Sequence, residues 1–106
     1  MAKALIRVPT EARKGEVIEV KTLISHPMES GQRHDNMGRP IPRDIINRFV
    51  CTYNGEEVFR ADLFPAIAAN PFIAFFTVAT ESGELVFRWR DDHGTTQTET
   101  ARITVV

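Results

Sequence analysis

Apolar and polar residues alternate one by one along most of this chain, which is the period of a β-strand with one buried face. The clearest case is 18–24, where Ile18, Val20, Thr22 and Ile24 share one face and charged residues such as Lys21 take the other. Runs of this kind, or short runs rich in β-branched and aromatic residues, recur at 4–8, 18–24, 45–53, 58–61, 72–80, 85–89 and 101–105. No helical period extends over any length, so the pattern predicts an all-β protein.

Short turn signals separate these predicted strands. Asn54-Gly55 and Ser82-Gly83 each predict a tight hairpin turn, because these residue types tolerate turn conformations well. The sequence 91–94 predicts a third turn. The apolar segment 61–71 contains two prolines and predicts a loop with at most one helical turn. Asn47 breaks the alternation of the third run.

About seven short antiparallel strands in 106 residues predict one domain, 1–106, with an immunoglobulin-like β-sandwich fold. Leu85, Phe87 and Trp89 share one strand face and are expected in the core, while Arg88 and Arg90 point outward. The chain has one cysteine, so the disulfide of antibody domains is excluded.

Composition and charge narrow the class of function. The net charge of -1 gives no field that would attract nucleic acid, and no apolar run reaches the length of about 18 residues that a membrane span needs. The first fifteen residues lack the long apolar segment of a signal peptide, since Arg7 interrupts them. By sequence alone we expect a cytosolic protein, unless a partner carries it out, that binds neither nucleic acid nor membrane.

Cys51 is a poor candidate for a nucleophile. Its position in the strand places it on the same apolar face as Phe49 and Tyr53. A reactive cysteine needs partial exposure and a neighbouring base, whereas a buried cysteine behaves as a small hydrophobic residue. We expect an inert, structural thiol.

The long polar segment 26–42 holds His26, Met28, His34 and Met37. Imidazole and thioether groups are a ligand set suited to copper, so a copper-binding module is one interpretation. The spacing matches no metal motif, and methionines also form adaptable contact surfaces. We favour a contact surface and expect no metal site and no cofactor.

No catalytic set is evident elsewhere. His34-Asp35 with Ser25 or Ser30 lacks the nucleophile elbow and the oxyanion-hole pattern of a hydrolase. Asp91-Asp92 is more typical of a turn with solvated carboxylates than of a cation site. We therefore expect a protein that is not an enzyme.

The stretch 72–79 is apolar on both faces, which is unusual for a strand of a lone sandwich. One interpretation is that the preceding loop folds over the sheet; the other is a protein–protein interface. We predict an interface, and we predict that the isolated chain self-associates through this stretch. The residues expected to form the interface are Leu63, Phe64, Ile67, Ile73 and Phe75.

Two long motifs resemble a known family. The first comprises Val8-Pro9, Gly15 to Lys21, His26-Pro27-Met28 and Gly31, and the second comprises Pro65 to Pro71 followed by Phe72 and Phe75. These motifs resemble the Z subunit of the bacterial sulfur-oxidation (Sox) carrier complex, and the resemblance covers essentially the whole chain.

That resemblance implies a non-catalytic subunit in the oxidation of thiosulfate to sulfate. The family implies a heterodimer, or a higher assembly, with a Y subunit whose cysteine-bearing arm carries the sulfur intermediates and visits the Sox enzymes. It implies a periplasmic location reached by co-export with that partner. On this view the loop residues His26, Met28, His34 and Met37 lie near the carrier arm.

Overall fold

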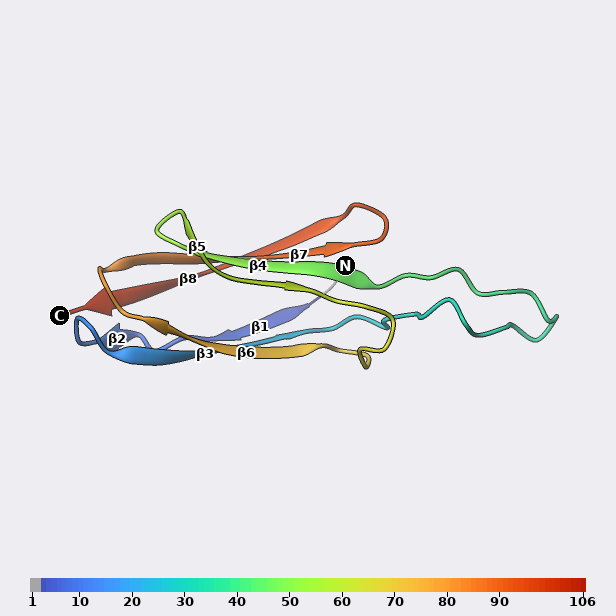
Figure 1. Cartoon of the computed structure of the whole chain (residues 1–106), viewed down its shortest axis with the longest axis horizontal. Helices are drawn as coiled ribbons and strands as arrows, with labels where there is room; N and C mark the ends of the chain where they lie inside the picture. Colours follow the sequence, from blue (N-terminus) through green and yellow to red (C-terminus); the bar gives the residue numbers. More distant parts are fainter. Residues whose placement is uncertain (1–2) are drawn as a thin grey trace.

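The structure, a computed structural model, describes residues 3–106, and this part of the chain consists of strands, turns and loops without a helix. The strands are β1 Ala4–Arg7, β2 Glu11–Ala12, β3 Val17–Ile24, β4 Ile46–Tyr53, β5 Glu56–Asp62, β6 Phe72–Val78, β7 Gly83–Asp91 and β8 Thr96–Val105. They form a three-stranded sheet, in the order β1-β3-β6, and a five-stranded sheet, in the order β2-β8-β7-β4-β5. Figure 1 shows the two sheets facing each other, which confirms the predicted sandwich.

The pairing between strands is antiparallel except for β2, which lies parallel to β8 over two residues. This strand is the one that the sequence pattern does not predict, because two residues are too few to show an alternation. No helix that is long and apolar enough to cross a membrane occurs in residues 3–106.

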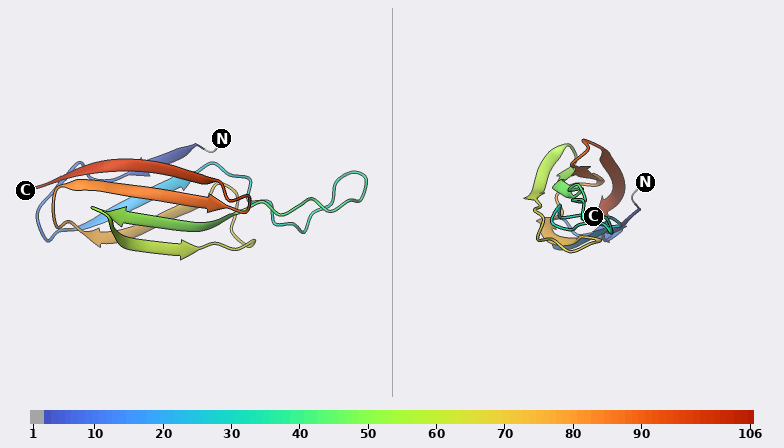
Figure 2. Two further views of the ribbon diagram at one scale, coloured as in Figure 1. Left: turned by 90° about the horizontal axis from the view of Figure 1, so that it is seen from above. Right: turned by 90° about the vertical axis from the view of Figure 1, so that its right-hand side faces the viewer.

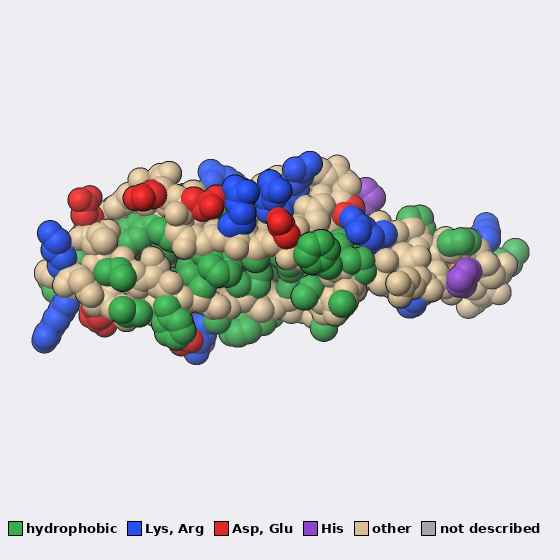
Figure 3. Space-filling model, in the orientation of Figure 1, with side chains coloured by type: hydrophobic (Ala, Val, Ile, Leu, Met, Phe, Trp, Pro, Cys, Tyr) green, Lys and Arg blue, Asp and Glu red, His purple; other side chains and the backbone are tan. Residues whose placement is uncertain are grey.

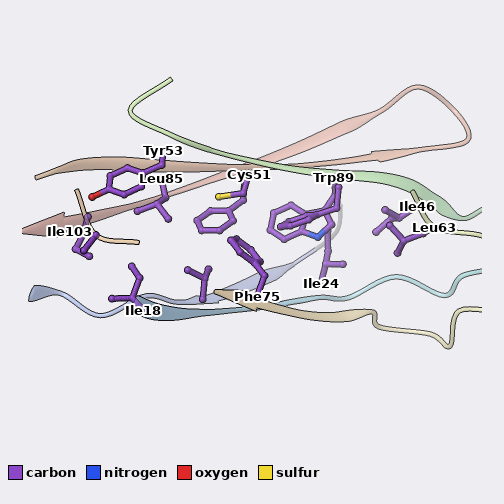
Figure 4. Packing of buried hydrophobic residues seen from close by; sticks show 14 of the residues in the cluster. Ile18, Ile24, Ile46, Cys51, Tyr53, Leu63, Phe75, Leu85, Trp89 and Ile103 are labelled. Carbon is purple, nitrogen blue, oxygen red and sulfur yellow. The ribbon is translucent and has the colours of Figure 1, made fainter. Parts of the chain in front are cut away.

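The core lies between the sheets and is rich in aromatic residues (Figure 4). Strand β3 buries the face that the alternation predicts, and the hydroxyl of Thr22 on that face donates to the carbonyl oxygen of Ile73 at 3.0 Å. The rings of Phe59 and Phe75 stack across the two sheets, with centroids 4.5 Å apart. Trp89 is 1% exposed, as predicted.

Two of the three predicted turns join paired strands. Asn54 and Gly55 both have positive φ and connect β4 to β5, and Asp91 to Gly94 connects β7 to β8. The predicted Ser82-Gly83 hairpin is wrong, because β6 pairs with β3 while β7 pairs with β4 and β8.

The connection at Ser82-Gly83 crosses from one sheet to the other. Gly83 is needed there for space, since a Cβ atom would lie 1.8 Å from Oδ1 of Asn54. That same oxygen accepts the backbone N–H of Glu84, and the hydroxyl of Tyr53 accepts the N–H groups of Thr80 and Glu81. Gly83 is therefore required because the start of β7 lies against the turn at Asn54.

The break in alternation at Asn47 is a β-bulge. The register of β4 against β7 shifts between Ile46 and Arg48, so Asn47 is an extra residue in β4. The shift places Ile46 on the same buried face as Phe49, Cys51 and Tyr53. The segment 61–71 continues β5 to Asp62 and then turns, as predicted, without a helix.

Residues 25–45 leave the sandwich as an extended arm, which is the projection in Figures 1 and 2. It gives the molecule principal extents of 59 × 19 × 19 Å. Its two sides are joined by isolated bridges between Glu29 and Asp44 and between His34 and Pro40. The chain reverses at Asp35 to Gly38, where Gly38 N–H donates to the Asp35 carbonyl oxygen at 3.0 Å.

Candidate partner-binding face and arm

The outer face of the three-stranded sheet is apolar and exposed. Its exposed apolar residues are Leu5, Val17, Leu23, Phe72, Ala74, Phe76 and Val78, and we call this set the apolar face. Phe72 and Phe76 are 61% and 66% exposed, although a lone domain gains by burying aromatic rings. Exposed apolar clusters of this kind mark interaction sites.

The strand register places these side chains in rows across the sheet. Leu5 lies opposite Leu23, which lies opposite Phe72, and Val17 lies opposite Val78. Between these two rows sit Glu19 and Lys21, which form an ion pair at 3.5 Å. The face is thus apolar at both ends, and in its centre the exposed Phe76 and Ala74 lie opposite the charged Glu19 and Lys21.

The outer face of the five-stranded sheet is charged instead of apolar. It carries the arginines Arg48, Arg60, Arg88 and Arg90. Arg48 pairs with Asp62 at 3.4 Å, and Arg60 pairs with Glu57 at 2.9 Å. Figure 3 shows charged side chains along the upper part of the molecule and hydrophobic ones along its middle and lower parts. The two outer faces are therefore suited to different environments.

The predicted interface residues divide between surface and core. Phe64 and Ile67 are exposed on the loop before β6. Leu63 and Phe75 are buried and Ile73 is half-buried against the same core, so the structure corrects this part of the prediction. Phe75 points inward because it lies opposite Val20, on the buried face of β3.

The residues that the prediction omitted are Phe72, Phe76 and Val78, which stand on the outward face of β6. The signal for them was present in the sequence, since 72–79 is apolar on both faces. The sequence does not show which of the two faces of this strand points into the core.

The four soft side chains of the arm are not brought together. His26 and Met28 lie at its base, whereas His34 and Met37 lie at its tip, where Met37 is 77% exposed. Met28 is buried, and its sulfur accepts the N–H of Ile46 at 3.2 Å. This geometry gives no support to the copper-binding interpretation.

The base of the arm is fastened to the turn between β7 and β8 through Asp92. Its two carboxylate oxygens accept Arg43 Nε–H and Nη2–H, both at 2.8 Å, and also the N–H of Ile45 and the amide of Asn47. The hydrogen bonds from Arg43, ahead of those from Asn47 and Ile45, lower the pKa of Asp92 to about 2. The arm therefore has a fixed root.

Cys51 and the His34-Asp35 pair both lack the arrangement that their candidate catalytic roles would need. Burial raises the pKa of the Cys51 thiol to about 12, and the side chain is 0% exposed. Asp35 Oδ1 accepts the N–H groups of Met37 and Arg39, so this carboxylate caps the tip turn. No hydrogen bond joins it to His34 within the described residues.

Solved structures share this fold at low sequence identity. The superoxide reductase (neelaredoxin) from Ignicoccus hospitalis superposes with a TM-score of 0.76 at 16% identity, over 97% of this chain and 80% of that chain. The sulfur carrier protein SoxY from Chlorobium limicola f thiosulfatophilum superposes with a TM-score of 0.68 at 14% identity, over 97% and 78% of the two chains. At these identities the likeness concerns the fold.

Sequence comparison gives a family. No curated protein matches the chain significantly. The family model described as "Sulphur oxidation protein SoxZ" matches residues 6–102, which is most of the sequence.

Proposed function

The chain belongs to the family of the sulphur oxidation protein SoxZ, which places its role in sulfur oxidation, and we propose that it is the non-catalytic subunit of a two-subunit covalent sulfur carrier. Its partner is a SoxY-type subunit whose cysteine arm bears the sulfur intermediates of thiosulfate oxidation. The pair works in the periplasm, which this chain reaches by co-export with that partner.

The observation that carries this proposal is the apolar face. Phe72 and Phe76 are exposed to water in the isolated domain. Burying their surface against a partner would stabilise the complex by about 25 cal/mol per Å² of apolar area. Aromatic residues at the centre of an interface are typical hot spots. We place the SoxY-type subunit on this face.

The state of Cys51 supports a division of labour between the subunits. Covalent transfer of sulfur requires a thiolate that meets the other reactants, and the thiol of Cys51 is buried with its pKa raised to about 12. The carrier thiol therefore belongs to the partner. A carrier held on a mobile arm visits several enzymes at high effective concentration.

The arm of residues 25–45 gives this subunit a second contact surface, away from the apolar face. Its tip exposes His34 and Met37, at the far end of the long axis of the molecule (Figure 2). We propose that this tip meets the partner's carrier arm or the Sox enzymes that visit it. The fastening of the arm's root by Asp92 keeps its direction fixed.

Substitution of Phe76 by Arg tests the proposed interface. Phe76 lies opposite Glu19, so an arginine finds a carboxylate across the strand and the monomer keeps its fold. We expect Phe76→Arg to weaken binding to a separately purified SoxY-type subunit by at least about tenfold, as measured by calorimetric titration.

Thr100→Arg is the matched control. It places the same charge on an exposed strand position of the other outer face, opposite Val86. Wild-type affinity for the control and reduced affinity for Phe76→Arg support the proposal. Equal affinity of both variants contradicts it.

A further inference from the structure

Three segments that are distant in sequence meet in a pocket at the root of the arm. His26, just after β3, Asp44, on the returning side of the arm, and Asp91, at the end of β7, line the pocket, and His93 of the following turn lies beside Asp44. One ligand atom each from His26, Asp44 and Asp91 lie within 4.8 Å of one another. Asp44 Oδ1 lies 3.7 Å from His26 Nε2 and 3.5 Å from His93 Nε2.

The two shorter spacings are close to those in the coordination shell of a small divalent ion. With metal–ligand bonds of about 2.0–2.1 Å in a tetrahedron, neighbouring ligand atoms are separated by about 3.3 Å. The observed separations of 3.5 and 3.7 Å exceed this by a few tenths of an ångström. The ligand atoms of His26, Asp44 and Asp91 lie within 4.8 Å of one another, so closing the shell requires side-chain rotations, and the ring of His93, which is 67% exposed, has room to turn.

The pocket also contains unsatisfied polar atoms. Asp44 Oδ1 is buried and has no hydrogen-bond partner in residues 3–106. Trp89 lines the same pocket and is 1% exposed, and its Nε1–H has no acceptor there. Figure 4 shows the indole nitrogen on the side of the ring nearer Ile24 and Ile46, which also line the pocket. The unpaired Asp44 oxygen can ligate a cation, whereas the Trp89 N–H is a donor and needs an acceptor, such as a water molecule bound to that cation.

The backbone around the cluster is already fixed. Asp44 exchanges two backbone hydrogen bonds with Glu29, and the N–H of His26 donates to Oδ1 of Asn70 at 3.0 Å. Asp91 Oδ1 accepts the N–H groups of His93 and Thr95, both at 2.9 Å. These contacts fix the backbone at the cluster and orient the Asp91 carboxylate before a ligand arrives.

We propose that this pocket binds a divalent transition-metal ion of the Zn²⁺ class through His26, Asp44, Asp91 and His93. Two carboxylates with two neutral imidazoles carry a charge that one divalent ion neutralises. Mixed imidazole and carboxylate ligands favour zinc and its neighbours over Ca²⁺ or Mg²⁺, which prefer shells of oxygen atoms. The proposal does not depend on the carrier function.

Binding requires one proton to move on His26. Its Nδ1 accepts the N–H of Met28 at 3.0 Å, so the neutral ring holds its proton on Nε2. When Nε2 becomes the ligand, that proton leaves and Nδ1 takes one up, and the ring remains neutral. The Met28 N–H then loses its acceptor. Metal binding is therefore expected to change the environment of the Met28 amide, although Met28 does not contact the ion.

Titration of the metal-free full chain with Co²⁺, followed by visible absorption and by displacement with Zn²⁺, tests the site. We expect saturation at one ion per chain and a shift of the Met28 amide resonance in NMR. We expect Asp44→Asn and His93→Gln to weaken binding by at least about tenfold. Both variants preserve the backbone hydrogen bonds of their residues, and circular dichroism verifies their folding.

His34→Gln is the matched control, because His34 lies at the arm tip, outside the cluster. Wild-type affinity for this variant, together with losses in the two cluster variants, supports the proposal. Absence of saturable binding to the wild-type chain overturns it. Equal affinities of the wild type and Asp44→Asn overturn it as well.

Discussion

The burial of Cys51 argues against a function in which this chain itself uses a reactive thiol. Its side chain is 0% exposed, and desolvation raises the pKa of its thiol to about 12. Its position between Phe49 and Tyr53 on the buried face of β4 follows directly from the alternation in the sequence. The sequence therefore suffices to predict the inert thiol, and the structure confirms its burial.

We expect the thiol of Cys51 to resist alkylation in the native protein at pH 8, because the thiolate is the reactive form and is rare at that pH. Mass spectrometry after iodoacetamide treatment measures this, and full labelling in urea is the control. Stoichiometric labelling of the native chain would show that the thiol is accessible and would reopen its role as a sulfur acceptor.

Asp92 provides a prediction on pH. The pKa of its carboxyl is about 2 in the folded chain, below the value of about 3.9 for an unfolded aspartate, so the unfolded chain binds more protons between these values. Stability from this residue is present above about pH 4 and is lost as the pH falls toward 2.

We expect Asp92→Asn to lower the free energy of unfolding by about 1 kcal/mol at pH 7, a modest value because Arg43 is partly exposed and water screens the pair. The difference between variant and wild type should vanish near pH 2 in urea unfolding. Asp62→Asn is the control. Asp62 is more exposed than Asp92, so the loss of its ion pair with Arg48 should have a smaller effect. A difference that persists unchanged at pH 2 would contradict this account.

At the scale of elements, the sequence predicts which residues share a strand face but not which face turns inward. For β6 both faces are apolar, so the choice between Phe75 and Phe76 depends on its pairing with β3. The pairing partner is itself a long-range feature, as the Ser82-Gly83 connection shows: it has the residues of a hairpin turn but joins two sheets. The same limit hides the cluster of His26 and Asp44, which the fold brings together.

The two sides of the arm are joined by isolated bridges, and Gly31 lies close to one of them. This residue has a φ of +85°, and a Cβ atom would lie 3.0 Å from the Cβ of Arg43. We expect Gly31→Ala to separate the two sides of the arm and to speed hydrogen exchange at the amides of Glu29 and Asp44 by at least about tenfold, from a local cost above about 1 kcal/mol.

Gly38→Ala is the control for that experiment, since Gly38 has a φ of +76° and an added Cβ meets no atom within 4 Å. It shares the backbone strain without the steric contact, so its effect on the amides of Glu29 and Asp44 should be smaller. Equal exchange rates in the two variants would show that the arm tolerates separation of its sides at this point.

At the scale of the whole molecule, the two outer faces of the sandwich differ in chemistry. One is the apolar face, and the other carries Arg48, Arg60, Arg88 and Arg90. We expect the isolated chain to self-associate through the apolar face, in a manner that depends on concentration. Sedimentation equilibrium should show a shift toward monomer for Phe76→Arg and upon addition of a SoxY-type subunit. A wild-type chain that remains monomeric at about 100 μM would contradict this expectation.

Solvent exposure of methyl groups, measured with a soluble paramagnetic agent before and after binding, shows directly whether a SoxY-type subunit covers the apolar face. The methyl groups of Leu5, Val17 and Val78 report on the apolar face, and those of Val50 and Val86 report on the opposite outer face. We expect the SoxY-type subunit to protect the first set and to leave the second unchanged. Protection of Val50 and Val86 with continued exposure of Leu5, Val17 and Val78 would contradict this expectation.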